Sequence, residues 1–143
     1  MKPLENRLIE TLQAHGVRST MARRATFATL QNALEPLTLQ QIAIKTKSAD
    51  RASVYRTLEL FEALGIVSIV FIGLKKRFEL AAPFKSHHHH IYCERCKKVV
   101  SIDSPSLEKL IKSISEQKGF HLHQHTLELS GICENCERRA DTQ

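Results

Sequence analysis

No apolar run in this 143-residue sequence approaches the roughly 20 residues that a membrane-spanning helix needs, so we expect a soluble protein. The first seven residues are polar and lead into a helical pattern, which favours neither a signal peptide nor a transit peptide. Internal repeats and low-complexity stretches are missing, apart from one run of histidines. Cysteine is restricted to four residues with metal-ligand spacing, and this predicts a reducing, cytoplasmic location.

The four cysteines form two pairs, Cys93 with Cys96 and Cys133 with Cys136. In each pair two residues separate the cysteines, so that two thiolates can approach one metal ion from a tight turn. We therefore predict a structural Zn²⁺ bound by all four thiolates. Between the pairs lie 36 residues, enough for a strand, a helix and another strand. The alternative, two redox-active dithiols, requires a thioredoxin-like βαβ context that neither pair has.

Charge divides the chain into two parts. Residues 1–86 hold 13 Lys and Arg against 7 Asp and Glu, a net charge of +6, whereas residues 87–143 hold 8 of each sign. All the cysteines and all but one of the eight histidines lie in the second part. We therefore predict a basic domain over residues 1–82 that could contact phosphates, a hinge over 83–86 and a metal-binding domain over 87–143.

Apolar spacing in the first part predicts four helices followed by a β-hairpin. Gly16 ends the first helix and Gly65 the fourth, since glycine tolerates positive φ. The expected N-cap residues of the other helices are Thr20, Thr38 and Asp50. Strands over 66–72 and 77–80 flank a turn over 73–76. Helices closed by a basic hairpin make a winged helix-turn-helix, and the fold class is α/β (α+β).

The fourth helix has the composition of a DNA-recognition helix. Arg51, Tyr55 and Arg56 lie off its apolar stripe, so they project outward when the core forms. Tyrosine could pack on thymine methyl groups and arginine could reach guanine or phosphate. On the hairpin, the expected backbone contacts are Lys75, Lys76 and Arg77. An ordinary amphipathic helix with a charged exterior remains an equally good reading of the helix alone.

The second part places histidines near the predicted zinc site. In a strand, neighbouring side chains point to opposite faces, so His87 and His89 face one way and His88 and His90 the other. Ser104 and Pro105 start a helix whose expected buried residues are Leu107, Leu110, Ile111 and Ile114. A long strand with a bulge is expected from Phe120 to Ser130, carrying His121, His123 and His125 at alternate positions. We interpret His121 and His123 as solvent-facing.

Several motifs occur together in this chain. They are Thr20-Met21-Ala22-Arg23, Ala52-Ser53-Val54-Tyr55-Arg56-Thr57-Leu58, Gly65-Ile66-Val67, Arg77-Phe78-Glu79-Leu80, the histidine run six residues before Cys93, and Gly131-Ile132-Cys133 with Cys136. Their combination resembles the ferric uptake regulator family of metal-dependent bacterial repressors over nearly the whole chain. The resemblance implies a homodimer, an N-terminal winged helix that binds an inverted repeat in operator DNA, and a C-terminal α/β dimerisation domain. It adds Arg23 and Ser53 to the expected DNA contacts.

The resemblance also implies two sites for a corepressor metal. Carried over residue by residue, one site consists of His87, His89, Glu108 and His125, where many relatives have Asp at position 89. The regulatory site, which ties the two domains together in the family, matches at Glu79, His88 and His90. Its other ligand positions fall at Pro36 or Leu37 and at Ser101, for which Asp103 could substitute. We predict Fe²⁺ or Zn²⁺ as the regulatory ion, with Mn²⁺ a third candidate.

We interpret the chain as a metal-responsive transcriptional repressor of metal homeostasis genes, and not as an enzyme. A peroxide-sensing repressor of the same family is one alternative, although aspartate-rich iron ligation would be expected there. A zinc-storage or zinc-delivery protein is another, which leaves Tyr55, Arg56 and the basic wing without a role. A zinc hydrolase would need an open metal ion and a general base, whereas a four-cysteine site is closed.

Overall fold

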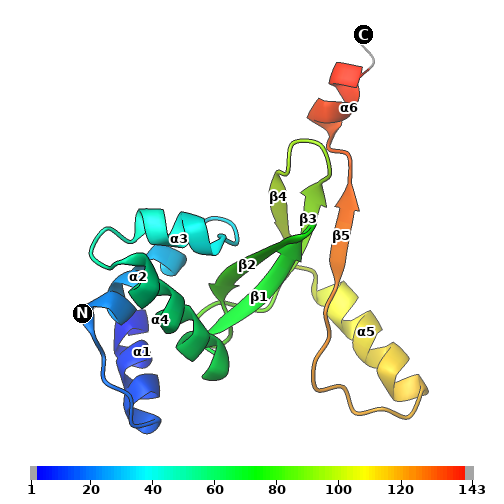
Figure 1. Cartoon of the computed structure of the whole chain (residues 1–143). Coiled ribbons are helices and arrows are strands. Elements are labelled where there is room, and N and C mark those ends of the chain that lie inside the picture. Colours follow the sequence, from blue (N-terminus) through cyan, green and yellow to red (C-terminus); the bar gives the residue numbers. More distant parts are fainter. Residues whose placement is uncertain (1–2, 141–143) are drawn as a thin grey trace. The chain divides into compact units, whose positions relative to one another are not determined.

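The computed structural model describes residues 3–140, which divide into two compact units between Ser86 and His87 (Figure 1). Among these residues, none of the helices is long and apolar enough to cross a membrane.

The first unit is a helical bundle with a two-stranded antiparallel sheet (Figure 1). Its elements are α1 (Pro3–Ala14), α2 (Met21–Gln31), α3 (Leu39–Lys45), α4 (Arg51–Ala63), β1 (Val67–Ile72) and β2 (Lys75–Leu80). The predicted N-caps Thr20, Thr38 and Asp50 are confirmed, since each side chain accepts a hydrogen bond from the backbone N–H three residues on. Thr38 also forms a reciprocal capping box with Gln41.

The first unit has a hydrophobic core of its own. The buried side chains are Leu8, Leu12, Phe27, Leu30, Leu37, Ile42, Val54, Leu58, Phe61, Ile66, Val67, Phe78, Leu80 and Phe84. Phe84 lies in the segment expected to be a hinge and packs edge-on against Phe27, with ring centroids 5.2 Å apart. The core of the first unit therefore extends to Phe84.

The hairpin of the first unit has a two-residue turn. Pairing runs from Val67 opposite Leu80 to Ile72 opposite Lys75. The turn therefore consists of Gly73 and Leu74, and Gly73 has a φ of +61°, in the left-handed region that favours glycine. The predicted four-residue turn is too long, because the register extends pairing through Lys75.

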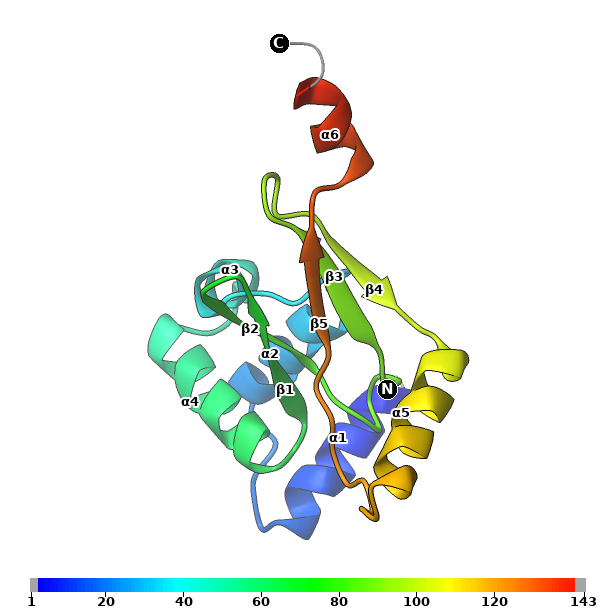
Figure 2. The ribbon, with the colours of Figure 1, turned by 90° about the vertical axis from the view of Figure 1, so that its right-hand side faces the viewer.

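The second unit is built on a three-stranded sheet of order β4-β3-β5 (Figure 2). Its elements are β3 (His89–Cys93), β4 (Val99–Ile102), α5 (Pro105–Gln117), β5 (Glu128–Gly131) and α6 (Glu134–Ala140). β3 pairs antiparallel with β4 and parallel with β5. The predicted start of α5 is confirmed, with Ser104 as N-cap and Pro105 in the first turn.

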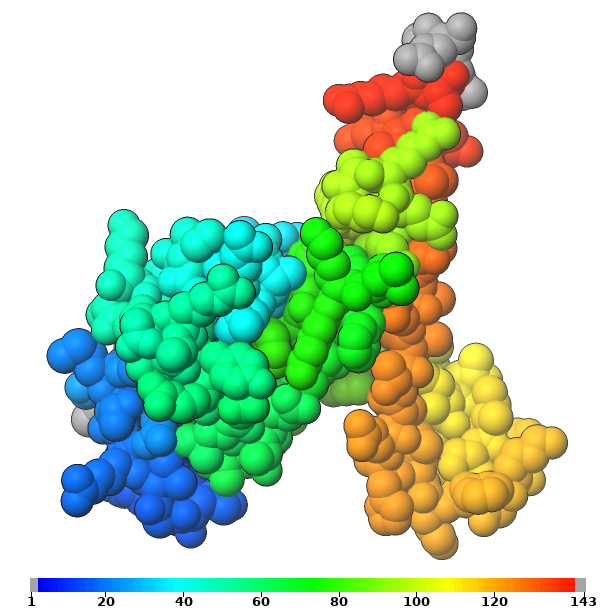
Figure 3. Space-filling model, in the orientation of Figure 1, coloured from blue at the N-terminus to red at the C-terminus, as the bar shows by residue number. Residues whose placement is uncertain are grey.

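The expected burial of α5 is wrong for a single chain. None of its residues is buried, and Leu110 and Ile114 are 57% and 51% exposed. Figure 3 shows α5 at the surface of the face in view. On the sheet, Ile91, Val100 and Leu129 are neighbours across the three strands and are also exposed. The prediction of an amphipathic helix is confirmed, but residues 3–140 of a single chain do not bury its apolar side.

The expected strand from Phe120 to Ser130 is also wrong in its first part, because only Glu128–Gly131 is a strand. Parallel pairing with β3 begins at His90 opposite Glu128, and β3 itself begins at His89. Residues before Glu128 therefore have no neighbouring strand to pair with, and 120–127 form an irregular segment beside α5.

Candidate metal centres and nucleic-acid interface

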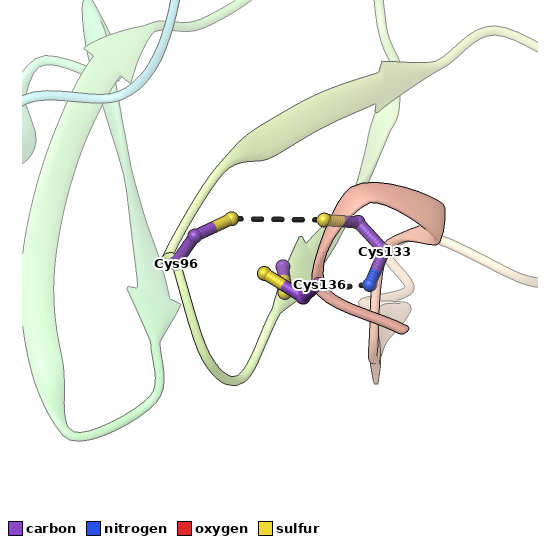
Figure 4. A group of neighbouring side chains, drawn as sticks. Cys96, Cys133 and Cys136 are labelled. Carbon is purple, nitrogen blue, oxygen red and sulfur yellow. Dashed lines mark hydrogen bonds between the residues drawn. The ribbon is translucent and has the colours of Figure 1, made fainter. Parts of the chain in front are cut away.

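The four cysteines come together at one end of the second unit. Cys93 ends β3, Cys96 lies in the turn before β4, and Cys133 and Cys136 lie around the start of α6. Their sulfur atoms are all within 4.8 Å of one another, and Sγ of Cys96 is 3.7 Å from Sγ of Cys133 (Figure 4). Four sulfur atoms bound to zinc at about 2.3 Å lie about 3.8 Å apart in a tetrahedron. The cluster therefore fits structural zinc.

The environment of the cysteines prepares them to bind a cation. Backbone N–H groups of Cys133 and Cys96 lower the pKa of Cys93 to about 6 by hydrogen bonding to its thiolate. The pKa of Cys136 is shifted the other way, to about 12, because a side-chain hydrogen bond with Cys133 and burial both favour its protonated thiol. A metal-free cluster at neutral pH therefore retains protons that a metal ion must displace.

Two side chains that support this cluster, Arg95 and Ser130, are not among the residues predicted from the sequence. Arg95, inside the first cysteine pair, donates from Nη1 to the carbonyl of Cys136 at 3.0 Å. Ser130 donates to Glu94 at 2.9 Å, which joins β5 to the same turn. Helix α6 was missed as well, and the only sequence signal was the Glu134 to Arg138 spacing of one helical turn, which forms an ion pair.

A second donor cluster consists of His87, His89, Glu108 and His125. His87 precedes β3, His89 begins it, Glu108 lies in the first turn of α5, and His125 belongs to the irregular segment. The Nε2 atom of His125 is 3.1 Å from Nε2 of His87 and 3.2 Å from Nε2 of His89. Oxygen atoms of Glu108 lie 2.7 Å from His89, 3.1 Å from His125 and 3.5 Å from His87.

These distances suit a divalent ion held by four ligands. Nitrogen and oxygen ligands at about 2.0 to 2.2 Å from zinc form tetrahedral edges of about 3.3 to 3.6 Å. Three imidazole nitrogens that converge on one point repel through their lone pairs unless a proton or cation lies between them. Burial opposes ionisation of Glu108, but its hydrogen bond to His89 and the histidine charges prevail and lower its pKa. The carboxylate is therefore ionised and available as a ligand.

The third predicted site, Glu79 with His88 and His90, draws on both units and stays a prediction. In the first unit, Glu79 lies on β2 and accepts a hydrogen bond from Lys85 at 3.1 Å. In the second unit, the rings of His88 and His90 lie edge-on with centroids 4.7 Å apart. Asp103 is exposed just before α5.

The predicted recognition residues lie on α4. Arg51, Tyr55 and Arg56 are exposed, with Tyr55 49% exposed despite its aromatic ring. A hydrogen bond to Glu59, one turn on, raises the pKa of the Tyr55 hydroxyl, which therefore stays protonated. Ser53 is half-buried and both its backbone N–H and its hydroxyl donate to Asp50. Arg23 on α2 is half-buried and donates to the carbonyl of Arg18.

The wing residues do not all face solvent. Lys75 and Lys76 are exposed, and Lys76 lies 3.5 Å from Glu62. Arg77 is only 8% exposed; its Nη1 donates to the carbonyl of Pro36 at 3.2 Å and lies 3.8 Å from Glu35. The prediction that Arg77 contacts DNA is therefore corrected. Alternation places Arg77 on the face of β2 opposite the core residues Phe78 and Leu80, and the loop before α3 covers it there.

Comparison with known proteins supplies independent information. The model of the ferric uptake regulator family matches residues 14–130. The chain is 32% identical to the ferric uptake regulation protein of Campylobacter jejuni over 95% of this chain and 90% of that protein. It is also 32% identical to the peroxide operon regulator of Bacillus subtilis, over 92% of each. A ferric uptake regulator from Pseudomonas aeruginosa, solved with manganese, matches with a TM-score of 0.74 at 26% identity, covering 91% of this chain and 98% of that one.

Proposed function

Because the chain belongs to the ferric uptake regulator family, we propose that it is a metal-responsive repressor that binds operator DNA as a homodimer in the cytoplasm. One observation carries the proposal. A single chain holds a helix that presents Arg51, Tyr55 and Arg56 to solvent and a four-ligand cluster suited to an exchangeable divalent ion. A storage protein would use the second feature but not the first.

The homodimer follows from the apolar surfaces of the second unit. Leu110 and Ile114 on α5, with Ile91, Val100 and Leu129 on the sheet, are large apolar side chains exposed on the second unit, and exposed apolar patches commonly mark protein–protein interfaces. A second copy of the chain can cover these surfaces. The first unit would then be present twice, as an inverted repeat in operator DNA requires.

The exchangeable metal has two proposed positions. The cluster of His87, His89, Glu108 and His125 would support the dimer, since all four ligands belong to the second unit. Glu79, His88 and His90 would form the regulatory site, since a metal ion shared by both units can bias the position of the recognition helix. A ligand shifts such an equilibrium only by its differential affinity for the two states.

The regulatory ion would be Fe²⁺ or Zn²⁺, with Mn²⁺ a third candidate, and the regulated genes would serve metal homeostasis. Imidazole and carboxylate ligands accept all three ions, and cellular availability contributes to the choice. The Bacillus relative is named a peroxide operon regulator, but a cluster of three histidines and one glutamate lacks the aspartate-rich ligation expected of a peroxide sensor.

The test is metal analysis of protein purified anaerobically without added metal, followed by operator binding measured with each divalent ion in turn. We expect one tightly held zinc per chain and operator binding that appears only with one of the candidate ions. Operator binding that is identical in excess chelator and in every ion would contradict a metal-responsive repressor.

A further inference from the structure

A groove of about 410 Å³ runs between α5 and the irregular segment that follows it. Glu108 and His125, two ligands of the four-ligand cluster, line this groove. The groove therefore opens directly onto the cluster. Its walls also carry Glu116, His121 and His123, none of which belongs to any of the three predicted metal sites.

His121 and His123 are exposed. In the part of the chain that the structure describes, no hydrogen bond, ion pair or ring contact involves either side chain. Neutral imidazole is the commonest metal ligand in proteins. With His125 they form an alternating series in which the last member already belongs to the cluster.

The groove lies on a different side of α5 from its apolar stripe. Glu108, Lys112 and Glu116 are four residues apart and share the groove side of the helix. Leu107, Leu110 and Ile114 lie more than a quarter turn from all three of these residues around the helix axis, and Ile111 lies between the two sides, about 60° from Glu108. A partner chain that covers the apolar stripe would therefore leave this side of the helix open.

We propose that His121 and His123 form a transient binding site for a divalent ion of the zinc type, through which the ion enters and leaves the cluster. The proposal rests on the proposed function only in requiring that the cluster binds metal. A hydrated ion exchanges its first waters for these imidazoles and then for those of His125 and its neighbours. Glu116, 3.9 Å from Lys112, adds a carboxylate on the same wall.

An entry path has a definite kinetic signature. It changes neither the free protein nor the loaded cluster, so it cannot change their equilibrium. It must therefore accelerate loading and release by the same factor. Clefts that concentrate ions raise association rates by about tenfold or more, so removing the path should slow both directions by about that factor.

The experiment uses the full-length protein with its cysteine site filled and Co²⁺ as the probe, because Co²⁺ bound to nitrogen and oxygen ligands absorbs visible light. Stopped-flow absorbance measures loading, and mixing the loaded protein with excess chelator measures release. The phase that belongs to the cluster is the one that His125→Ala removes. The test variant is His121→Ala with His123→Ala. The matched control is Gln124→Ala with Thr126→Ala, two exposed residues of the same segment that do not line the groove.

We expect the histidine variant to load and release Co²⁺ about tenfold more slowly with an unchanged dissociation constant, and the control to match the unaltered protein. Unchanged rates would overturn the proposal. A larger dissociation constant in the histidine variant would also overturn it, since the two histidines would then be ligands of the cluster. Equal slowing by the control would assign the effect to the segment and not to the imidazoles. If the unaltered protein shows no phase that depends on His125, the cluster itself does not bind metal, and the proposed function loses that site.

Discussion

Replacing Cys96 by serine should unfold the second unit while the first stays folded. Cys96 is the most informative of the four cysteines because it is exposed. Its loss therefore creates no cavity in a core, and any large effect must act through the metal. Serine is nearly isosteric with cysteine but is a poor zinc ligand.

The expected size of the effect follows from what the second unit buries. Within residues 87–140, the buried side chains of a single chain are those of His89, His90, Cys93 and Cys136. Fully burying an apolar side chain contributes about 1.5 to 3 kcal/mol, so these few residues cannot replace a core. Structural zinc in small domains contributes on the order of 10 kcal/mol, comparable to the stability of a whole domain. Losing one thiolate should therefore abolish folding of the second unit and, with it, dimerisation.

The assay combines zinc analysis with hydrogen exchange measured peptide by peptide. In Cys96→Ser we expect zinc to be lost and protection to disappear across β3, β4, α5 and β5. Protection should persist in α2 and α4, because the first unit has its own core. Asn135→Ser is the matched control, since Asn135 is an exposed residue inside the other cysteine pair. A Cys96→Ser protein that keeps full zinc and a protected second unit would refute the four-cysteine assignment.

Three further predictions concern the DNA-binding unit and the switch. Tyr55→Ala should lose about 1 to 3 kcal/mol of operator binding with little effect on binding to random DNA. Lys76→Ala should weaken binding to both and reduce the slope of log affinity against log salt concentration by about one. Titrations of both variants at several salt concentrations separate the two effects. Asp50→Ala should lower the Tm of the first unit at neutral pH. Because hydrogen bonds from Ser53 lower the pKa of Asp50 below 3.8, its contribution is complete above that pH and the difference in Tm should shrink as pH falls through the depressed pKa. His90→Ala should abolish metal-dependent operator binding in a protein that stays dimeric, whereas His125→Ala should mainly weaken the dimer. If metal titrations show the reverse, the four-ligand cluster is the regulatory site and the site with His90 supports the dimer.

Local sequence signals predicted the fold well wherever a few neighbouring residues decide it. The N-caps Thr20, Thr38, Asp50 and Ser104 are confirmed because a cap needs only its own side chain and the next turn. The family and the winged-helix fold class are confirmed as well.

Features that depend on distant partners were not predictable. The parallel pairing of β5 with β3 begins at Glu128 because β3 itself begins at His89, opposite this part of the chain. The sequence near Phe120 and His125 contains no signal of that limit. The inward direction of Arg77 depends on the carbonyl of Pro36, 41 residues away. The prediction that the apolar side of α5 is buried is wrong for a single chain, because an amphipathic pattern is the same whether one chain or two chains cover it.

The five-residue strand β3 has His89 at its first position and Cys93 at its last, on the same face of the sheet. At about 3.3 Å per residue, an ion at each end lies about 13 Å from the other. Four thiolates outweigh the charge of a zinc ion, so an ion at the other end of the strand meets no positive charge to repel it. The separation also exceeds the Debye length of about 8 Å at physiological ionic strength, so the remaining interaction between the two sites is weak. A zinc ion at the cysteines and an ion at the proposed cluster of His87, His89, Glu108 and His125 would therefore load independently, although one short strand supplies ligands to both. Any communication between them must be mechanical, through displacement of the strand, and a rigid strand of this length leaves little room for it.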